Sequence, residues 1–237
     1  MPALVITRAA NHSPSLADQM IAQGWQALTI PLVDAHATNS PLPAGPFDLC
    51  LAISPNAIKF AVANQSDALR TLQSLPLVAV GNTTAQQARA AGWQQTASPT
   101  NASSEALLEL SLLQQVTDKR ILLLCGRGGR QLIETTLQAR GATVTRWEVY
   151  QRQPVILTGA QREQIEQLSS PKWVLVSSVS ALSALKELKS MPLIVTSQRI
   201  SDQANAQGFT VDWQLGVVED EKIVNELAKR IPVKDQK

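Results

Sequence analysis

Short apolar runs alternate with amphipathic stretches along most of the chain. The runs are apolar throughout, which is typical of strands buried on both faces of a parallel sheet. The stretches between them repeat apolar residues every three or four positions, which predicts helices that cover those faces. Glycines follow several helical stretches, at Gly24, Gly92, Gly141 and Gly208, where a left-handed helix end favours glycine. The pattern predicts strands at residues 3–7, 27–32, 48–54, 77–81, 120–126, 144–150, 173–178 and 193–197.

A weak internal repeat divides this pattern into two kinds of segment. Residues 4–32 and 121–150 share the order strand, polar turn, helix, glycine and strand. Residues 48–93 resemble residues 173–209 in the same way. The two kinds of segment alternate along the chain, which predicts two similar α/β domains with parallel sheets. The repeat leaves open which segment of the first kind shares a sheet with which segment of the second kind.

Two irregular segments indicate where the chain passes between the domains. Residues 34–46 are polar and rich in Pro and Gly, and residues 151–162 are similarly irregular. Each follows a segment of the first kind, so we expect two crossings. The predicted organisation is a discontinuous α/β domain of residues 1–33 and 156–237, a second α/β domain of residues 39–146, and linker strands at 34–38 and 147–155, with a cleft between the domains.

The composition restricts the class of protein. The 237 residues are 44% hydrophobic and 17% charged, which is ordinary for a globular protein. A net charge of +2 without a dense run of Lys and Arg argues against a nucleic-acid partner but is compatible with a small anionic ligand. The N-terminal residues lack a signal-peptide pattern, and no apolar run approaches the roughly 20 residues of a membrane helix. Cys50 and Cys125 lie apart in apolar strands and suggest no disulfide, so we expect a cytoplasmic protein.

The sequence GRGGR at residues 126–130 follows an apolar strand and precedes a helix, as phosphate-binding turns do. It lacks the third glycine of a dinucleotide fingerprint, because Gln131 occupies that position, and no Walker lysine follows. A nucleotide site is therefore disfavoured. Two interpretations stay open. The turn is a flexible connection, or its backbone N–H groups and the flanking Arg127 and Arg130 form an anion site at a helix N-terminus.

Comparable polar turns follow the other predicted strands. Each hydroxyl in them could serve as a helix N-cap. All of them, however, lie at the carboxyl ends of parallel strands, which is the edge where open α/β sheets bind ligands. Together they would suit a ligand that carries several carboxylates. The candidate ligand-binding residues are Arg8, Ser54, Asn56, Gly81, Thr83, Thr84, Gly126, Arg127, Gly129, Arg130, Ser177, Ser178, Ser197 and Arg199.

Established catalytic and metal-binding motifs are missing from the sequence. His12 and His36 have no partner at a metal-ligand spacing, which predicts no metal site, and we expect no cofactor. The two cysteines are expected to be core residues. Tyr150 is the one tyrosine of the chain and ends a predicted strand at a proposed domain crossing. It could act as an aromatic anchor or take part in the chemistry.

An ordered set of motifs runs along nearly the whole chain. The motifs are LVITR at 4–8, IPL at 30–32, SPNAIKFA at 54–61, AVGNTTA at 79–85, SSEALL at 103–108, LCGRGGRQLIETTLQARGA at 124–142, VYQR at 149–152 and VTSQRISDQANAQGF at 195–209. This set resembles the uroporphyrinogen-III synthase family. The chain departs from the family pattern at Ser197-Gln198-Arg199, where many members have a Gly-Pro-Thr-type turn.

The resemblance implies a function and several site residues. The expected activity is cyclisation of hydroxymethylbilane, with inversion of its last pyrrole ring, to uroporphyrinogen III for the biosynthesis of haem and sirohaem. The resemblance implies a monomeric enzyme without a cofactor, adds Ser103 and Ser104 as substrate ligands, and implies that Tyr150 assists as a general acid. The upstream hydroxymethylbilane synthase is a candidate transient partner, and neither nucleic acid nor a membrane is expected. Two alternatives stay open: a two-lobed protein that binds a polyanion without catalysis, and a nucleotide-dependent transferase.

Overall fold

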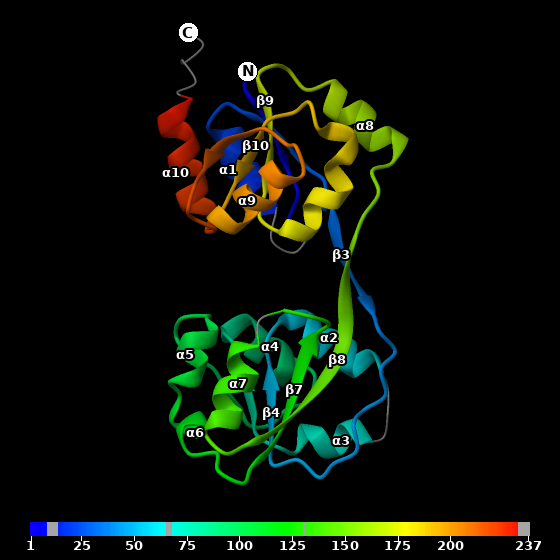
Figure 1. Ribbon diagram of the computed structural model, residues 1–237, viewed down its shortest axis with the longest axis vertical. Helices are drawn as coiled ribbons and strands as arrows, with labels where there is room; N and C mark the ends of the chain where they lie inside the picture. The colour runs from blue at the N-terminus through cyan, green and yellow to red at the C-terminus, as the bar shows by residue number, and fades with distance from the viewer. Residues whose placement is uncertain (9–13, 65–67, 130, 232–237) are drawn as a thin grey trace. The chain divides into compact units, whose positions relative to one another are not determined.

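The computed structural model describes residues 1–8, 14–64, 68–129 and 131–231. The chain forms two compact units, the first made of Met1–Asp34 and Gln153–Lys237 and the second of Ala35–Arg152. Figure 1 shows that each unit has its own sheet covered by helices. This arrangement of two α/β units confirms the predicted fold class.

The first unit contains five strands in the order β11-β10-β9-β1-β2, and each neighbouring pair is parallel. Its strands are β1 (Ala3–Ile6), β2 (Gln26–Thr29), β9 (Lys172–Val176), β10 (Leu193–Val195) and β11 (Val211–Gln214). Its helices are α1 (Pro14–Ala22), α8 (Gly159–Glu166), the 3₁₀ helix η1 (Val179–Leu188), α9 (Gln198–Ala206) and α10 (Asp220–Arg230).

Successive residues of β1 pack into two different cores, one on each face of the sheet. Val5 belongs to a buried cluster with Leu185 of η1. Leu4 belongs to a second buried cluster with Met20 of α1 and Leu227 of α10. Because successive side chains of a strand point to opposite faces of the sheet, a strand that is apolar throughout contributes apolar side chains to both cores.

The second unit contains six strands in the order β3-β8-β7-β4-β5-β6. Its strands are β3 (Val33–Ala37), β4 (Leu49–Ala52), β5 (Leu77–Ala79), β6 (Thr96–Ala97), β7 (Arg120–Gly126) and β8 (Thr143–Pro154). Its helices are α2 (Pro55–Ala63), α3 (Ala68–Gln73), α4 (Asn82–Ala90), α5 (Ser104–Leu108), α6 (Ser111–Gln114) and α7 (Leu132–Ala139).

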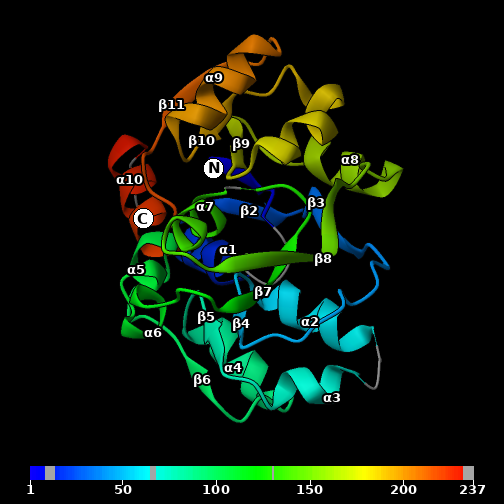
Figure 2. The same ribbon diagram turned by 60° about the horizontal axis from the view of Figure 1, so that its bottom comes forward.

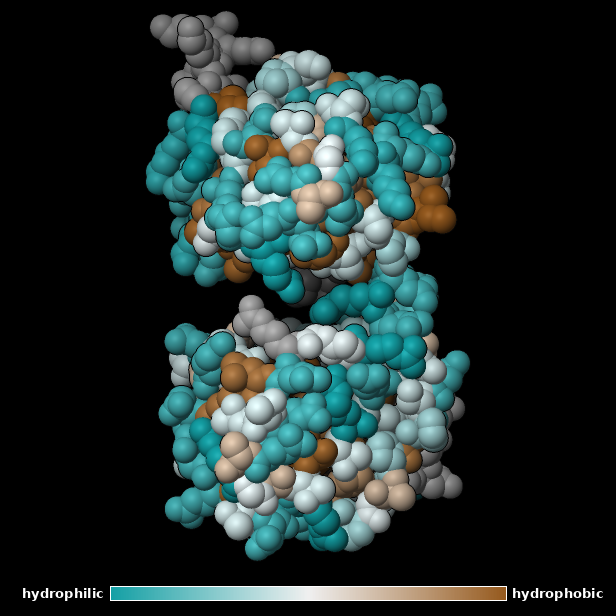
Figure 3. All heavy atoms as spheres, viewed as in Figure 1, coloured by the Kyte–Doolittle hydropathy of each residue, from teal (hydrophilic) through white to brown (hydrophobic). Residues whose placement is uncertain are grey.

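The second sheet is also covered on both faces. Leu122 of β7 packs in a cluster with Ile58 of α2. Leu123, its neighbour in sequence, packs in another cluster with Leu137 of α7. Figure 2 shows α2, α3 and α4 on one side of this sheet and α5, α6 and α7 on the other. Over both units, the face seen in Figure 3 is mostly hydrophilic, with small apolar areas between polar ones.

The two sheets have the same topology, which explains the sequence repeat. The order β2-β1-β9-β10-β11 in the first unit corresponds to β8-β7-β4-β5-β6 in the second. The first segment of the repeat shares its sheet with the last, since β1 pairs with β9. β3 is an additional strand beside β8, and each of these two strands includes residues of both units. Among the described residues, no helix is long and apolar enough to span a membrane.

Candidate functional site

Three residues that are far apart in the sequence meet at the carboxyl edge of the second sheet. Ser54 follows β4, Gly126 ends β7 and Tyr150 lies on β8, and these three strands are neighbours. The Ser54 hydroxyl accepts a hydrogen bond from the Ala57 N–H at 3.1 Å and thereby caps α2. The same oxygen lies 3.0 Å from the Tyr150 hydroxyl. Ser54 therefore serves as the helix cap that its position predicts, and it also contacts the candidate catalytic tyrosine.

The Tyr150 ring explains why residue 126 is a glycine. Gly126 and Tyr150 are paired across a register shift between β7 and β8. A Cβ atom on Gly126 would lie 2.6 Å from Tyr150 Cζ, so any larger residue would displace the ring. The ring is otherwise held by Phe60, at 5.7 Å between centroids, and only 3% of Tyr150 is exposed. The close packing fixes the position of the phenol at the strand ends.

The exposed part of the glycine turn comes after Gly126. Gly128 and Gly129 have φ angles of 75° and 94°, in the left-handed region that favours glycine, and the space beside both is open. Within the part of the chain that the structure describes, no backbone acceptor contacts their N–H groups. The following helix, α7, begins without a side-chain cap. The turn thus leaves N–H donors free at a helix N-terminus, as anion sites do. Arg130, a candidate ligand, lies outside the described residues.

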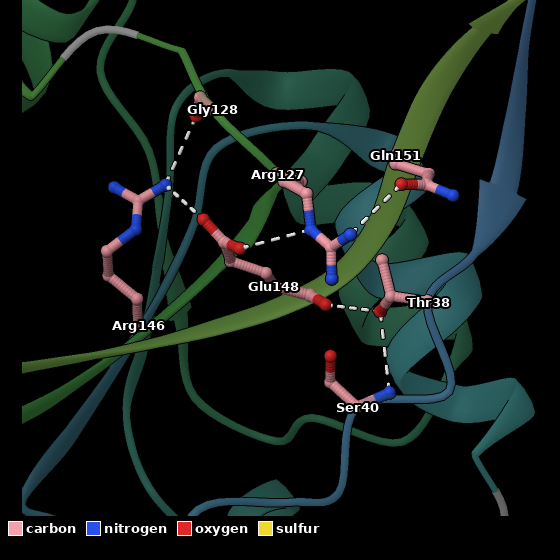
Figure 4. Close-up of polar contacts among 7 residues, drawn as sticks. All are labelled: Thr38, Ser40, Arg127, Gly128, Arg146, Glu148 and Gln151. Atoms are coloured by element: carbon pink, nitrogen blue, oxygen red, sulfur yellow. Dashed lines mark hydrogen bonds and ion pairs between the residues drawn. The ribbon is translucent and has the colours of Figure 1, made fainter.

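Arg127 is a well-exposed charged group of this turn, with 59% of its side chain accessible. Its Nε lies 3.6 Å from a Glu148 carboxylate oxygen, and its Nη1 donates to Gln151 Oε1 at 3.3 Å (Figure 4). Exposed contacts at such lengths contribute little to stability. The guanidinium is therefore free to exchange these partners for a ligand carboxylate.

Arg146 lies deeper beside the same turn and is not among the residues predicted from the sequence. Its guanidinium donates to Glu134 at 3.2 Å. It also donates to Glu148 at 3.2 Å and to the Gly128 carbonyl at 3.1 Å (Figure 4). Burial works to lower the pKa of Arg146, but the nearby Cys125 and the hydrogen bonds to the two glutamates raise the pKa above the ordinary arginine value. A charged residue inside the apolar strand VTRWEVY was the available signal.

The remaining candidates of the second unit differ in their accessibility. Ser103 caps α5 by accepting a hydrogen bond from Ala106 N–H at 3.0 Å, whereas its neighbour Ser104 lies in the first turn of α5. Gly81 is buried at the start of α4, and Thr84 is 2% exposed, so both pack inside the unit. Thr83 is exposed, and Asn56 is half-buried at the start of α2.

At the strand ends of the first unit, the candidate arginine Arg8 is already bound by other protein groups. Arg8 forms an ion pair with Asp220 and donates to the Val218 carbonyl at 2.5 Å and to Ser177 Oγ at 3.2 Å. Only 11% of its side chain is exposed, so this guanidinium is already occupied.

Two candidate hydroxyls of the first unit, those of Ser178 and Ser197, do not act as the predicted helix caps. Ser178 precedes η1 but contacts Ser180 Oγ at 2.7 Å instead of the helix backbone. Ser197 precedes α9 and likewise makes no capping bond, and Arg199 beside it is exposed. The segment after β9 is a 3₁₀ helix, in contrast to α2 after β4, where Ser54 caps the first turn. Local serine contacts of this kind compete with an α-helical start.

The cysteines belong to the cores, as predicted. Both are free and buried, and burial raises the pKa of Cys50 to about 12 and that of Cys125 to about 11. Neither thiol is therefore a nucleophile at neutral pH. Among the residues that the structure describes, no group of three or more His, Cys, Asp or Glu side chains could hold a metal ion.

The fold and these strand ends define a class of protein: a two-unit α/β protein whose candidate site offers hydroxyls, backbone N–H groups and arginines. A family profile described as "Uroporphyrinogen-III synthase HemD" matches residues 14–232. The uroporphyrinogen-III synthase of Escherichia coli (strain K12) is 32% identical, covering 87% of this chain and 92% of that protein. The same enzyme of Proteus mirabilis is 31% identical, covering 72% of this chain and 99% of that protein. The chain belongs to the uroporphyrinogen-III synthase family.

Solved structures agree with the fold. The crystal structure of uroporphyrinogen-III synthetase from Helicobacter pylori 26695 is similar with a TM-score of 0.69 at 17% identity, covering 97% of this chain and 99% of that one. A mutant uroporphyrinogen III synthase from Thermus thermophilus gives a TM-score of 0.55 at 16% identity, covering 97% of this chain and 98% of that one. At such low identity, this likeness concerns the fold alone.

Proposed function

We propose that this protein cyclises hydroxymethylbilane and inverts its last pyrrole ring, which gives uroporphyrinogen III for tetrapyrrole biosynthesis. The observation that carries the proposal is the family match over residues 14–232, supported by relatives that are more than 30% identical over most of the chain. Hydroxymethylbilane is a linear tetrapyrrole with an acetate and a propionate on each ring. Free N–H groups at the glycine turn and the exposed Arg127 suit carboxylates of this kind.

The proposed chemistry asks little of acidic or basic side chains. The hydroxyl of the terminal hydroxymethyl group leaves as water after protonation, and the pyrrole nitrogen supplies the electrons, so the remaining methylene becomes part of an azafulvene. The substituted α-carbon of the last ring attacks it and forms a spiro intermediate. That intermediate fragments and recloses through the other α-carbon, which loses its proton. Because closure without control gives the uninverted isomer, the main task of the protein is to hold one conformation of the substrate.

Tyr150 is the proposed general acid for the departing hydroxyl. Its ring is fixed against Gly126 and Phe60, and its oxygen lies 3.0 Å from Ser54 Oγ. If Ser54 donates in this contact, the phenol proton is directed elsewhere and is available for the leaving group. The proton released in the final ring closure restores the phenol.

The other proposed contacts are less directly supported. In the second unit they include Thr83, Gly129 and the capping residue Ser103. In the first unit, ligand contacts at Ser177, Ser178, Ser197 and Arg199 stay predictions. A transient contact with hydroxymethylbilane synthase, which would deliver an unstable substrate, stays a prediction of the family resemblance.

The test is an assay of the product isomer. Purified protein is incubated with hydroxymethylbilane, the products are oxidised, and the porphyrin isomers are separated. We expect mainly the type III isomer, whereas the reaction without protein gives type I. A protein that binds the tetrapyrrole but leaves the isomer ratio at that of the blank would be a binding protein, and the proposed activity would be wrong.

A further inference from the structure

A carboxylate that approaches the glycine turn would meet two glutamates unless another group neutralised them. Glu134 lies in the first turn of α7, and Glu148 lies on β8 within 3.6 Å of Arg127. Both side chains are partly buried, with 21% and 31% exposed. Negative side chains beside an anion site repel the ligand, and this repulsion can cost enough binding free energy to abolish recognition.

Arg146 contacts both of these carboxylates with one guanidinium. Nη1 lies 3.2 Å from Glu134 Oε2, and Nη2 lies 3.2 Å from Glu148 Oε1. Only 22% of the Arg146 side chain is exposed, so these ion pairs are less screened by water than those of Arg127. Arg146 therefore cancels much of the negative charge that surrounds the turn.

The same guanidinium also fixes the backbone of the turn. Arg146 Nη2 donates to the carbonyl oxygen of Gly128 at 3.1 Å. Gly128 and Gly129 have left-handed φ angles. Because glycine has no side chain, neither residue can hold the turn in place by a side-chain contact. A carbonyl bonded to Arg146 points toward β8, and the peptide N–H on its other side, that of Gly129, points away from it. Figure 4 shows the contacts of Arg146 with the Gly128 carbonyl and with Glu148. One residue thus sets the direction of an N–H donor and offsets part of the charge that would repel its ligand.

We propose that Arg146 is a positioning residue, which offsets the negative charge of Glu134 and Glu148 and fixes the glycine turn so that the turn receives a carboxylate of the substrate. The inference rests on the proposed function, and it adds a residue that touches the site and not the reacting atoms. It distinguishes two arginines beside one turn: Arg127 contacts the ligand, whereas Arg146 prepares the surface that the ligand meets.

The experiment compares Arg146→Met, Arg146→Lys and the double variant Arg146→Met/Glu134→Gln. Steady-state rates with hydroxymethylbilane give KM and kcat, and fluorescence titration with uroporphyrin, a carboxylate-rich macrocycle, gives a Kd without turnover. For Arg146→Met we expect KM and Kd to rise on the order of tenfold with kcat within about twofold, because binding and not the reacting atoms is affected. Lys restores the charge but not the bidentate geometry, so we expect an intermediate value.

The double variant separates charge from folding. It lacks the arginine but also lacks one of the two carboxylates that Arg146 contacts, so KM should fall back toward the wild-type value although stability does not recover. Arg120→Met is the matched control, since Arg120 pairs with Asp48 at the opposite end of β7. This control should leave KM unchanged.

Several outcomes would overturn the inference. A folded Arg146→Met protein with wild-type KM and Kd would show that Arg146 serves stability alone. A raised KM that Glu134→Gln makes worse would reject the neutralising role. If Arg146→Met does not fold, Arg146→Gln, which also lacks the charge, takes its place, and unchanged KM and Kd in the folded Gln protein lead to the same rejection. A wild-type protein that yields no excess of type III isomer would instead reject the proposed function, and the inference would fall with it.

Discussion

The sequence repeat aligns Arg8 with Arg127, but these two arginines have opposite environments, since Arg8 is mostly buried and Arg127 is exposed. Both residues follow corresponding strands of the two sheets: Arg127 comes directly after β7, and Arg8 is separated from β1 by Thr7. Arg8 is 11% exposed and forms an ion pair with Asp220 at the start of α10. Arg127 is 59% exposed, and its nearest carboxylate, Glu148, is shared with Arg146.

The difference shows that an arginine at the same position of the fold can either stabilise the structure or stay available for a ligand. In the first unit, α10 supplies a carboxylate that occupies Arg8 completely. In the second unit, the corresponding carboxylates are bound by a second arginine, and Arg127 remains accessible. The residue before each arginine differs as well. Thr7 is buried and donates to the Leu175 carbonyl, whereas Gly126 leaves room for the Tyr150 ring.

The largest expected effect comes from giving the second sheet the residue of the first, in Gly126→Thr. Its Cβ would lie 2.6 Å from Tyr150 Cζ, so the ring must leave its position. Overpacking of this kind costs about 1–3 kcal/mol of unfolding free energy, and we expect kcat to fall at least as far as in Tyr150→Phe. Urea denaturation and steady-state kinetics measure both quantities. In Gly126→Thr/Tyr150→Ala the stability loss caused by the clash should disappear; its persistence would mean that the ring is not what excludes a side chain.

Tyr150→Phe keeps the ring and removes the hydroxyl. A positioned general acid is typically worth ~10²–10⁴-fold. We expect kcat to fall by about 100-fold or less, with little change in KM, because the pyrrole nitrogen already activates the leaving group and water can substitute. The type III isomer should still predominate, since the carboxylate contacts set the orientation of the last ring.

Two results would contradict this role for Tyr150. Full activity of a stable Phe variant would reduce the tyrosine to an aromatic anchor. Release of mainly the uninverted isomer would show that the residue shapes the substrate and is not its acid.

The paired arginine variants Arg8→Met and Arg127→Met test the comparison directly. Arg8→Met leaves Asp220 without its partner, so we expect a loss of about 2 kcal/mol of unfolding free energy. Arg127→Met should change stability by less than about 0.5 kcal/mol but raise KM on the order of tenfold. Thermal or urea unfolding measures the stability of both variants, and steady-state kinetics measures their KM. If Arg8→Met raises KM as much as Arg127→Met does at equal folded fractions, Arg8 contacts the substrate and the contrast between the sheets is wrong.

Much of the fold was predictable because strands that are apolar throughout have few alternatives. Each of the eight predicted strands overlaps an observed one, and both cysteines are buried as expected. The strands β6 and β11 were missed because TA and VDWQ contain no apolar run, and they pair only at the sheet edges. In these places the neighbouring strand determines the structure, and the local sequence does not.

The site was less predictable, because its contacts depend on which strands are neighbours. The cap at Ser54 follows from local sequence, and it is observed. The contact of Ser54 with Tyr150, 96 positions along the chain, requires β4, β7 and β8 to be adjacent. For the same reason the sequence could not reveal that Arg8 is occupied by Asp220, or that Arg146 holds the turn at Gly128.

The smallest effects are expected at two serines that precede corresponding helices, Ser54 before α2 and Ser178 before η1. Ser54→Ala removes a side-chain cap, which typically costs about 1 kcal/mol of unfolding free energy. Ser178→Ala removes only a contact with Ser180, so its cost should stay below about 0.5 kcal/mol. Urea midpoints at constant m-value provide the measurement. Ser54→Ala should also lower kcat, by less than Tyr150→Phe does, because the phenol keeps its proton but loses its nearest oxygen partner. Equal stability losses at both positions would mean that the two strand ends are built alike, and that the contrast between them is confined to the arginines.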